Sequence, residues 1–300
     1  MPQPPRTAGV PRRRTGVPPI VLRHRQPAPG AATVYAVHPG ALSVRVWGAL
    51  ADALPPSAGL AVLDLAGVPE YFGAAISKDH GDLSVASLVD RLTDAYRADR
   101  AQAPQGPAPV FVGWSFGGVL AQAMTERLAP DERPAHLVLL DSIAPTEAYQ
   151  QPDDSLELPM LLRWFTMYLG AKRNSAVSAD SAGTDVTDTD TGLLRILDAA
   201  VAAGALPADT SLPGFRKLYD TYVEGLLRNN RLTAGHKPPV SSVPLVLVKA
   251  EGSLLPHDAT LGWPELAAYG LTLHTAPGDH YTMLTRPDAA DVIAELSGRR

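Results

Sequence analysis

Short apolar runs alternate with amphipathic stretches along most of this chain. The apolar runs are bounded by polar or turn-forming residues, which is typical of buried strands in a parallel sheet. We expect these strands at residues 33–38, 60–65, 110–112, 136–140, 243–248 and 271–275. Helices are predicted between them, near 43–54, after a Ser84 N-cap, over 116–129 and over 287–297. This alternation predicts an α/β fold with a doubly wound, mostly parallel sheet.

One long segment departs from this pattern. Residues 146 to about 235 contain no strand signal but hold helix candidates at 158–169, 193–203 and 215–228. The stretch 174–192 between the first two is rich in Ser, Thr, Asp, Ala and Gly, so it buries little surface and we expect it to be mobile. A helical insertion between two sheet strands predicts a lid over the edge of the sheet.

The N-terminal segment has a different composition. Residues 1–30 are rich in proline and arginine and contain no acidic residue. We predict a flexible basic tail there, followed by a single domain over residues 31–298.

Composition narrows the classes of function. The 300 residues are 45% hydrophobic, carry a formal net charge of −5 and include no cysteine. The negative charge argues against nucleic acid as a partner, and no apolar run is long enough to cross a membrane. No signal peptide is recognisable, so we expect a cytoplasmic protein. Without cysteine there is no disulfide, cysteine-based metal site or thiol nucleophile, and we expect no metal site.

The strongest local motif lies between the predicted strand 110–112 and the predicted helix 116–129. There Gly113-Trp-Ser115-Phe-Gly117 forms a Gly-x-Ser-x-Gly pentapeptide. The pentapeptide alone is weak, but a strand before it and a helix after it are typical of the nucleophile elbow of α/β-hydrolases. We expect a strained backbone at Ser115 that exposes its hydroxyl at the helix N-terminus, with the two glycines leaving room for nearby backbone.

A serine nucleophile needs a histidine base and an acid, which follow in the order serine, acid, histidine in this fold. His280 lies after the last predicted strand and before the last helix, where the base is expected. Asp141 and Glu251 both follow strands at the catalytic edge, and position alone leaves both open as the acid. Asp279 adjoins the base along the chain and is expected to point away from it.

The oxyanion that forms during acyl transfer needs two backbone N–H donors. The first is expected from Phe116, directly after the nucleophile. The second is expected from the loop His38-Pro-Gly-Ala-Leu42, and we predict Ala41 as its donor.

Taken in order, four segments resemble one family. They are Tyr35–Gly40, Gln105-Gly-Pro followed by Val112–Gly118, Leu137–Ser142 and Gly278–Tyr281. Together they resemble the thioesterases of nonribosomal peptide and polyketide synthesis, over about residues 18–298, and the chain-terminating type in particular. The resemblance implies Asp141 as the acid, because the acid of this family follows the strand after the elbow. It leaves open whether the chain acts in trans or as the terminal domain of an assembly.

The resemblance also implies a reaction. An acyl or peptidyl carrier protein delivers the substrate as a small-molecule acyl thioester on its phosphopantetheine arm, so no bound cofactor is expected. Ser115 takes the chain as an ester, which water hydrolyses or an internal nucleophile cyclises. An acyltransferase that uses another acceptor and a non-catalytic relative that only binds are the alternatives.

Substrate-binding residues are expected near the elbow and in the lid. Relatives commonly carry a pair of glycines in the oxyanion loop, whereas Ala41 and Leu42 follow Gly40 here, so Leu42 adds bulk beside the acyl site. Aromatic lid residues either line an acyl tunnel or pack the lid onto the core. The predicted substrate contacts are Leu42, Trp114, Trp164, Tyr168 and Tyr222.

Overall fold

A seven-stranded sheet forms the centre of the protein. The computed structural model describes residues 19–298 except 78–82, 103–105 and 151. The strand order is β1-β3-β2-β4-β5-β6-β7, with β1 antiparallel to β3 and every other neighbouring pair parallel. The strands are β1 Val21–Arg25, β2 Thr33–His38, β3 Gly59–Asp64, β4 Val110–Trp114, β5 His136–Leu140, β6 Leu245–Gly252 and β7 Leu271–Asp279.

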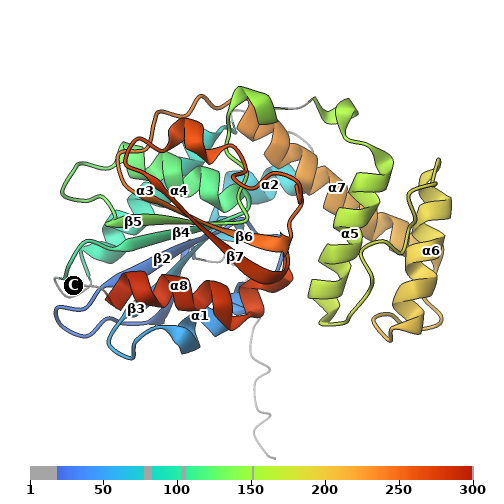
Figure 1. Ribbon diagram of the computed structural model, residues 1–300, viewed down its shortest axis with the longest axis horizontal. Helices are drawn as coiled ribbons and strands as arrows, with labels where there is room; N and C mark the ends of the chain where they lie inside the picture. The colour runs from blue at the N-terminus through green and yellow to red at the C-terminus, as the bar shows by residue number, and fades with distance from the viewer. Residues whose placement is uncertain (1–18, 78–82, 103–105, 151, 299–300) are drawn as a thin grey trace, which may run out of the picture.

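Helices cover both faces of this sheet (Figure 1). On one face lie α1 Gly48–Ala53 and α8 Pro287–Gly298, and on the other α3 Val85–Arg100 and α4 Phe116–Arg127. Alternate residues of β2 belong to different apolar cores. Val34 belongs to the core that includes residues of α1 and α8, and Tyr35 belongs to the core that includes residues of α3 and α4. Both cores are apolar, which confirms the predicted doubly wound architecture. The remaining core-side helices are α2 Pro69–Ser77 and the short 3-10 helices Val44–Trp47, Leu65–Gly67, Glu147–Tyr149, Asp153–Ser155, Trp263–Leu266 and Thr282–Thr285.

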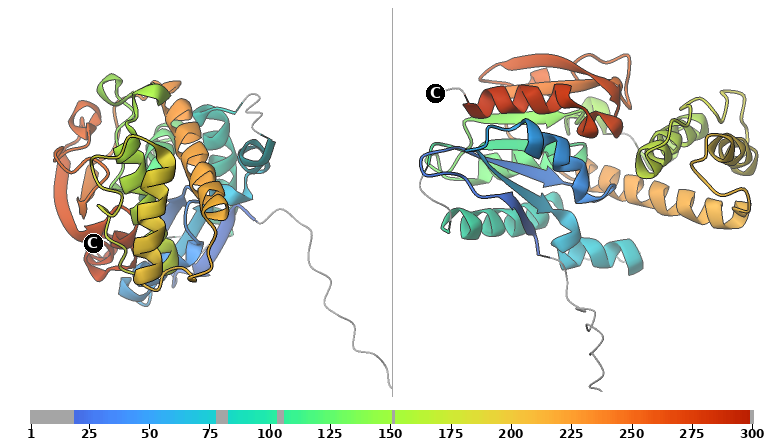
Figure 2. Two further views of the ribbon diagram at one scale, coloured as in Figure 1. Left: turned by 90° about the vertical axis from the view of Figure 1, so that its right-hand side faces the viewer. Right: turned by 90° about the horizontal axis from the view of Figure 1, so that it is seen from below.

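The segment between β5 and β6 forms a helical insertion. It contains α5 Leu158–Arg173, α6 Thr189–Ala202 and α7 Leu212–Ala234, so the three predicted helices are present and α7 is longer than predicted. Figure 2 shows α7 running outward from the core, with α5 and α6 beside it beyond the carboxyl ends of the strands. The insertion therefore stands over the sheet edge that carries the predicted catalytic residues.

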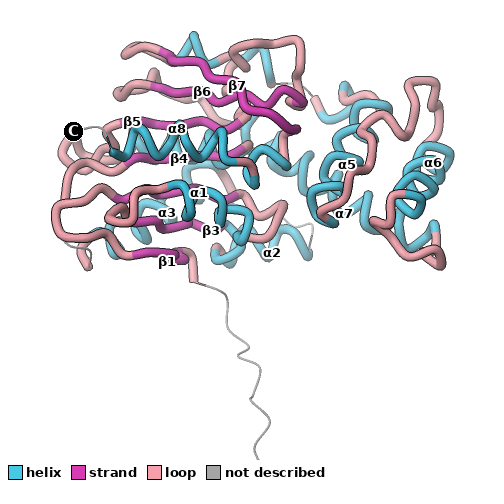
Figure 3. The backbone as a smooth tube through the Cα atoms, turned by 60° about the horizontal axis from the view of Figure 1, so that its bottom comes forward, coloured by secondary structure: helices cyan, strands magenta, loops and turns pink. Residues whose placement is uncertain are grey.

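The N-terminal prediction needs a correction. The predicted tail extended to residue 30, but Val21–Arg25 form β1, which pairs along β3 at the sheet edge (Figure 3). Arg23 forms an ion pair with Asp99 of α3, and the Arg25 guanidinium donates to the Ala58 carbonyl at 2.8 Å. An edge strand tolerates flanking prolines and outward charges, so its composition resembles that of a tail. Residues 1–18 lie outside the described part of the chain.

Candidate active site

Ser115 lies on a tight turn between β4 and α4. Its backbone has φ 54° and ψ −129°, a conformation that L-residues rarely adopt. The turn brings backbone segments too close for side chains at the neighbouring glycines. A Cβ on Gly117 would lie 2.3 Å from the Val37 carbonyl oxygen, and one on Gly113 would lie 2.4 Å from the Gly118 Cα. The predicted strained elbow and the predicted need for both glycines are confirmed.

Asp141 and His280 form a buried pair beside this elbow. Asp141 Oδ2 lies 2.7 Å from His280 Nδ1, and the two residues are 1% and 2% exposed. The second carboxylate oxygen of Asp141 accepts the Ala250 N–H at 3.1 Å. When Nδ1–H donates to the carboxylate, Nε2 of the neutral imidazole is the unprotonated, basic nitrogen.

The two other carboxylates considered at this edge, those of Glu251 and Asp279, are not hydrogen-bonded to His280. Glu251, the alternative acid, is exposed on β6. Asp279 accepts the backbone N–H groups of Tyr281 and Thr282 at 2.9 and 2.8 Å, so its carboxylate caps the following turn. Only Asp141, among the described carboxylates, is hydrogen-bonded to His280. Asp141 also has φ 43°, a strained position that nothing in the sequence indicated.

A pocket of about 550 Å³ brings Ser115, Asp141 and His280 together. The core supplies these residues, and the opposite wall comes from α5, α7 and residues 254–255. In the described part of the chain the Ser115 hydroxyl makes no side-chain hydrogen bond, which leaves it available to a ligand in the pocket. A hydroxyl, an imidazole and a carboxylate gathered in one apolar pocket are the groups that nucleophilic acyl transfer requires.

The two predicted oxyanion donors lie in different surroundings. Phe116 begins α4 and lines the pocket, so its N–H stands at the positive end of a helix. Ala41 lies in the loop after β2, is exposed and does not line the pocket. Leu42 is half-buried and does not line this pocket either, so its contact with substrate stays a prediction.

His38 holds that loop, a role that the sequence reading missed. The Trp47 indole N–H donates to His38 Nδ1 at 3.3 Å, so Nε2 carries the proton and donates to the Leu42 carbonyl at 2.8 Å. Burial lowers the pKa of His38 and outweighs the opposite effects of this hydrogen bond and of Asp64. His38 is therefore a neutral brace for the predicted oxyanion loop.

Trp114 lies behind the site and does not line the pocket. It is fully buried, and its indole N–H donates to the His280 carbonyl at 2.8 Å. Its ring stacks on His38, with centroids 5.9 Å apart, and packs against the His280 ring at 5.4 Å. The prediction that Trp114 contacts substrate is wrong, because it instead joins the loop brace to the base.

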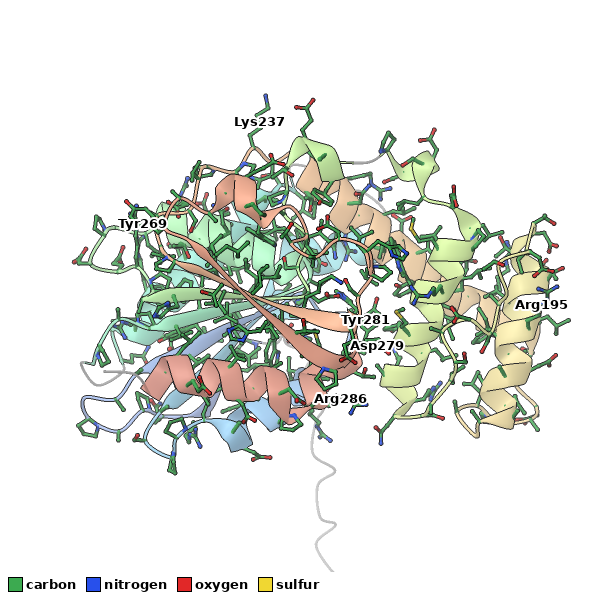
Figure 4. The ribbon with its side chains drawn as sticks, in the orientation of Figure 1. Arg195, Lys237, Tyr269, Asp279, Tyr281 and Arg286 are labelled. Atoms are coloured by element: carbon green, nitrogen blue, oxygen red, sulfur yellow. The ribbon has the colours of Figure 1, made fainter. Side chains whose placement is uncertain are left out.

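The aromatic residues of the insertion divide into two groups. Trp164 lines the pocket, as predicted. Tyr168 and Tyr222 do not: they stack on each other at 4.8 Å, and the Tyr222 hydroxyl lies 2.8 Å from that of Tyr281. Figure 4 shows Tyr281 at the end of β7 that faces α5. These two tyrosines pack the insertion onto the His280 loop, which is the packing alternative given for the aromatic residues of this segment.

Several polar residues of the pocket were not anticipated. Asn229, Asn230 and Thr233 of α7 line it, and the Tyr71 hydroxyl donates to Asn229 Oδ1 at 2.8 Å. Their spacing along one face of α7 was the available signal, but nothing in the sequence shows which face of a helix borders a cavity.

Within the described ranges, no helix is long and apolar enough to cross a membrane. Over the same residues, no three His, Asp or Glu side chains gather in an arrangement suited to a metal ion.

Comparison with known proteins bears on the family and the fold. A family model described as a thioesterase domain matches residues 32–299. Chondramide synthase from Chondromyces crocatus is 26% identical over 217 residues, which cover 71% of this chain but 5% of that protein.

Several solved structures resemble the fold of this chain over most of its length. A four-domain nonribosomal peptide synthetase matches with a TM-score of 0.63 and 23% identity, over 95% of this chain and 20% of that one. The thioesterase domain of NocB, from the nocardicin cluster, matches with a TM-score of 0.53 and 21% identity, over 90% of this chain and 96% of that one. ClbQ from the colibactin pathway matches with a TM-score of 0.52 and 15% identity, over 89% and 96%. These likenesses confirm the predicted α/β-hydrolase fold.

Proposed function

The chain belongs to the thioesterase family, and we propose that it releases an acyl, polyketide or peptidyl chain from a carrier protein through an ester on Ser115. The observation that carries this proposal is the Asp141–His280 pair in the same pocket as the strained Ser115. Two of the similar structures support the nature of the substrate, since one is a nonribosomal peptide synthetase and ClbQ belongs to the nonribosomal peptide and polyketide pathway of colibactin. The substrate would arrive as a thioester on the phosphopantetheine arm of an acyl or peptidyl carrier protein, and the enzyme itself would need no cofactor.

Acylation follows from the proton positions at the site. His280 Nε2 accepts the proton of the Ser115 hydroxyl as Oγ attacks the thioester carbonyl. The Phe116 N–H, and the Ala41 N–H in the loop braced by His38, stabilise the resulting oxyanion. The carbon–sulfur bond then breaks, His280 returns its proton to the departing thiol, and the acyl group remains on Ser115. Asp141 stabilises the imidazolium between these two proton transfers.

Deacylation reverses the roles of the same groups. A water molecule, or a hydroxyl or amine of the bound chain, gives its proton to His280 as it attacks the ester. The bond between the acyl carbon and Ser115 Oγ then breaks, and His280 returns the proton to Oγ. Water releases the free acid, and an internal nucleophile closes a ring. An external acceptor would make the protein an acyltransferase, which is the second candidate function. The walls contributed by α5 and α7 decide which nucleophile reaches the ester, because they close the pocket opposite Ser115.

Labelling of Ser115 tests this function directly. A fluorophosphonate should add to Ser115 in the folded protein, as seen by intact and peptide mass spectrometry, and the Ser115→Ala variant should remain unlabelled. With acyl N-acetylcysteamine thioesters, the wild type should show an acyl-enzyme mass and a released product. Thioester turnover by Ser115→Ala at the wild-type rate would overturn the mechanism, and an unlabelled wild type would support a protein that only binds.

A further inference from the structure

A second cavity adjoins the catalytic pocket. It has a volume of about 520 Å³ and lies between the start of α5, the α5–α6 connection near residues 179–184, and residues 254–258 after β6. Ser115, Asp141 and His280 do not line it. Its size lies within the range of small-molecule sites, so it is large enough to hold a substantial part of a ligand.

The two cavities share one wall. Met160, Trp164, Leu254 and Leu255 line both of them. The Trp164 side chain is almost fully buried, and its indole N–H donates to the Leu254 carbonyl at 3.2 Å. This contact joins α5 to the loop after β6, so Trp164 stands as a partition between the catalytic pocket and the second cavity.

The charged groups of the second cavity already have partners. Arg163 pairs with Asp180 at 3.3 Å near the surface. The Asp258 carboxylate accepts the N–H groups of Thr260 and Leu261, each at 2.9 Å, and the Tyr149 hydroxyl. Most of the remaining lining is apolar. An uncharged, apolar ligand suits such a cavity, because it buries this surface and leaves no charge unpaired.

We infer that the second cavity binds the distal, apolar part of the acyl chain whose carbonyl is held at Ser115, and that Trp164 sets how much of the chain enters it. This inference rests on the proposed thioesterase function. The shared wall supports this occupant, since Trp164, Met160 and Leu254–Leu255, which separate the second cavity from the catalytic pocket, also line the pocket that would hold the carbonyl. A chain too long for the first pocket then gains apolar contacts in the second, so long chains are bound better than short ones.

Ala179 offers a way to fill the second cavity alone. It is half-buried and lines this cavity but not the catalytic pocket. In Ala179→Phe, we expect kcat/KM for a dodecanoyl N-acetylcysteamine thioester to fall at least tenfold, while the value for the butanoyl thioester stays within twofold. Ala176→Phe is the matched control, because Ala176 is exposed on the same connection and lines neither cavity. Equal effects on both chain lengths, or on neither, would overturn the inference.

Two further measurements separate the possible outcomes. Trp164→Ala removes the partition and should raise the dodecanoyl-to-butanoyl ratio of kcat/KM. Ala179→Phe could instead lower kcat/KM more for an acyl-pantetheine than for an N-acetylcysteamine thioester with the same acyl chain. In that case the cavity holds the pantetheine arm, and the inference is wrong. Labelling of Ser115 by butyl and dodecyl fluorophosphonates repeats the comparison without turnover. Chain-length-dependent labelling without any thioester cleavage would contradict the proposed function but support the cavity assignment.

Discussion

The carboxylate of Asp141 has a different partner for each of its oxygens. Oδ2 binds His280 Nδ1 at 2.7 Å and Oδ1 accepts the Ala250 N–H at 3.1 Å. The backbone contact fixes the rotation of the carboxylate, and the carboxylate in turn fixes the plane and tautomer of the imidazole. Asp141 thus orients the base as well as supplying charge.

Replacing Asp141 by asparagine should remove both of these functions while keeping the shape of the side chain. The amide keeps the size of the side chain but removes the charge and presents an N–H to the imidazole, which favours the wrong tautomer. We expect kcat on a thioester substrate to fall by about 10⁴-fold, with little change in the melting temperature. Glu251→Gln is the control, because Glu251 is the exposed carboxylate of β6, and it should remain within twofold of wild type. A comparable loss in both variants would contradict the assignment.

His38 acts on the reaction only through the loop that it holds. His38→Leu removes both of its hydrogen bonds, and we expect kcat to fall by 10- to 100-fold with a smaller change in KM, since one oxyanion donor is worth roughly 10²–10³. The glutamine side chain offers both an amide N–H donor and a carbonyl acceptor, so the His38→Gln variant should recover part of the loss. If His38→Leu and His38→Gln are equally active, the loop does not depend on this brace.

The lowered pKa of His38 also predicts how stability changes with pH. Its pKa lies below the unfolded value of about 6.5, so the unfolded chain binds a proton at a pH at which the folded protein does not. The free energy of unfolding therefore decreases as pH falls below about 6.5, until His38 is protonated in the folded state as well. Urea titrations at pH 7 and pH 5.5 should show a smaller decrease in His38→Gln than in wild type.

At the scale of elements, the elbow depends on close backbone contact between β2, β4 and the start of α4. A methyl group on Gly117 would meet the Val37 carbonyl at 2.3 Å. Gly117→Ala should therefore force β2 and α4 apart and destabilise the protein by about 1–3 kcal/mol in urea unfolding, with loss of activity.

Gly225 provides the matched control within α7. A Cβ there would have no atom within 4 Å, and its φ is not positive. Gly225→Ala should stabilise the protein by about 0.5–1 kcal/mol, because alanine costs less backbone entropy in a helix. A similar cost for both substitutions would show that the contact at the elbow is not the cause.

The elements that could be predicted from sequence are those with a local cause. The strand at 136–140 is an unbroken apolar run, and the helix after Ser84 begins with a capping box between Ser84 and Ser87. The pairing partner of β1 lies far away in the sequence, so its pattern gives no comparable signal. The residues that line the pocket could be predicted even less well from the sequence. The sequence left open whether Tyr168 and Tyr222 line a tunnel or pack the insertion, because only the packing of the helices decides that they meet Tyr281 and that Trp164 borders a cavity.

At the scale of the whole molecule, a tyrosine pair couples the insertion to the catalytic base. Tyr222 of α7 and Tyr281, next to His280, share a hydrogen bond of 2.8 Å, and burial raises the pKa of both hydroxyls. Tyr281 also packs edge-on against Trp114 and Tyr168. The insertion is therefore attached to the core close to His280, and movement of α7 away from the core would disturb the base.

This coupling can be measured with a double-mutant cycle. Tyr222→Phe leaves the buried Tyr281 hydroxyl without its partner, which should cost about 1–3 kcal/mol of unfolding free energy and speed hydrogen exchange in α7 and the His280 loop. The Tyr222→Phe/Tyr281→Phe protein should lose less than the sum of the two single changes, because it leaves no unpaired hydroxyl. Tyr219→Phe on the same helix is the control, since the Tyr219 hydroxyl has no hydrogen bond among the described residues, and it should change stability by less than about 0.5 kcal/mol. Strict additivity of the two single changes would mean that the insertion is held by packing alone and moves independently of the base.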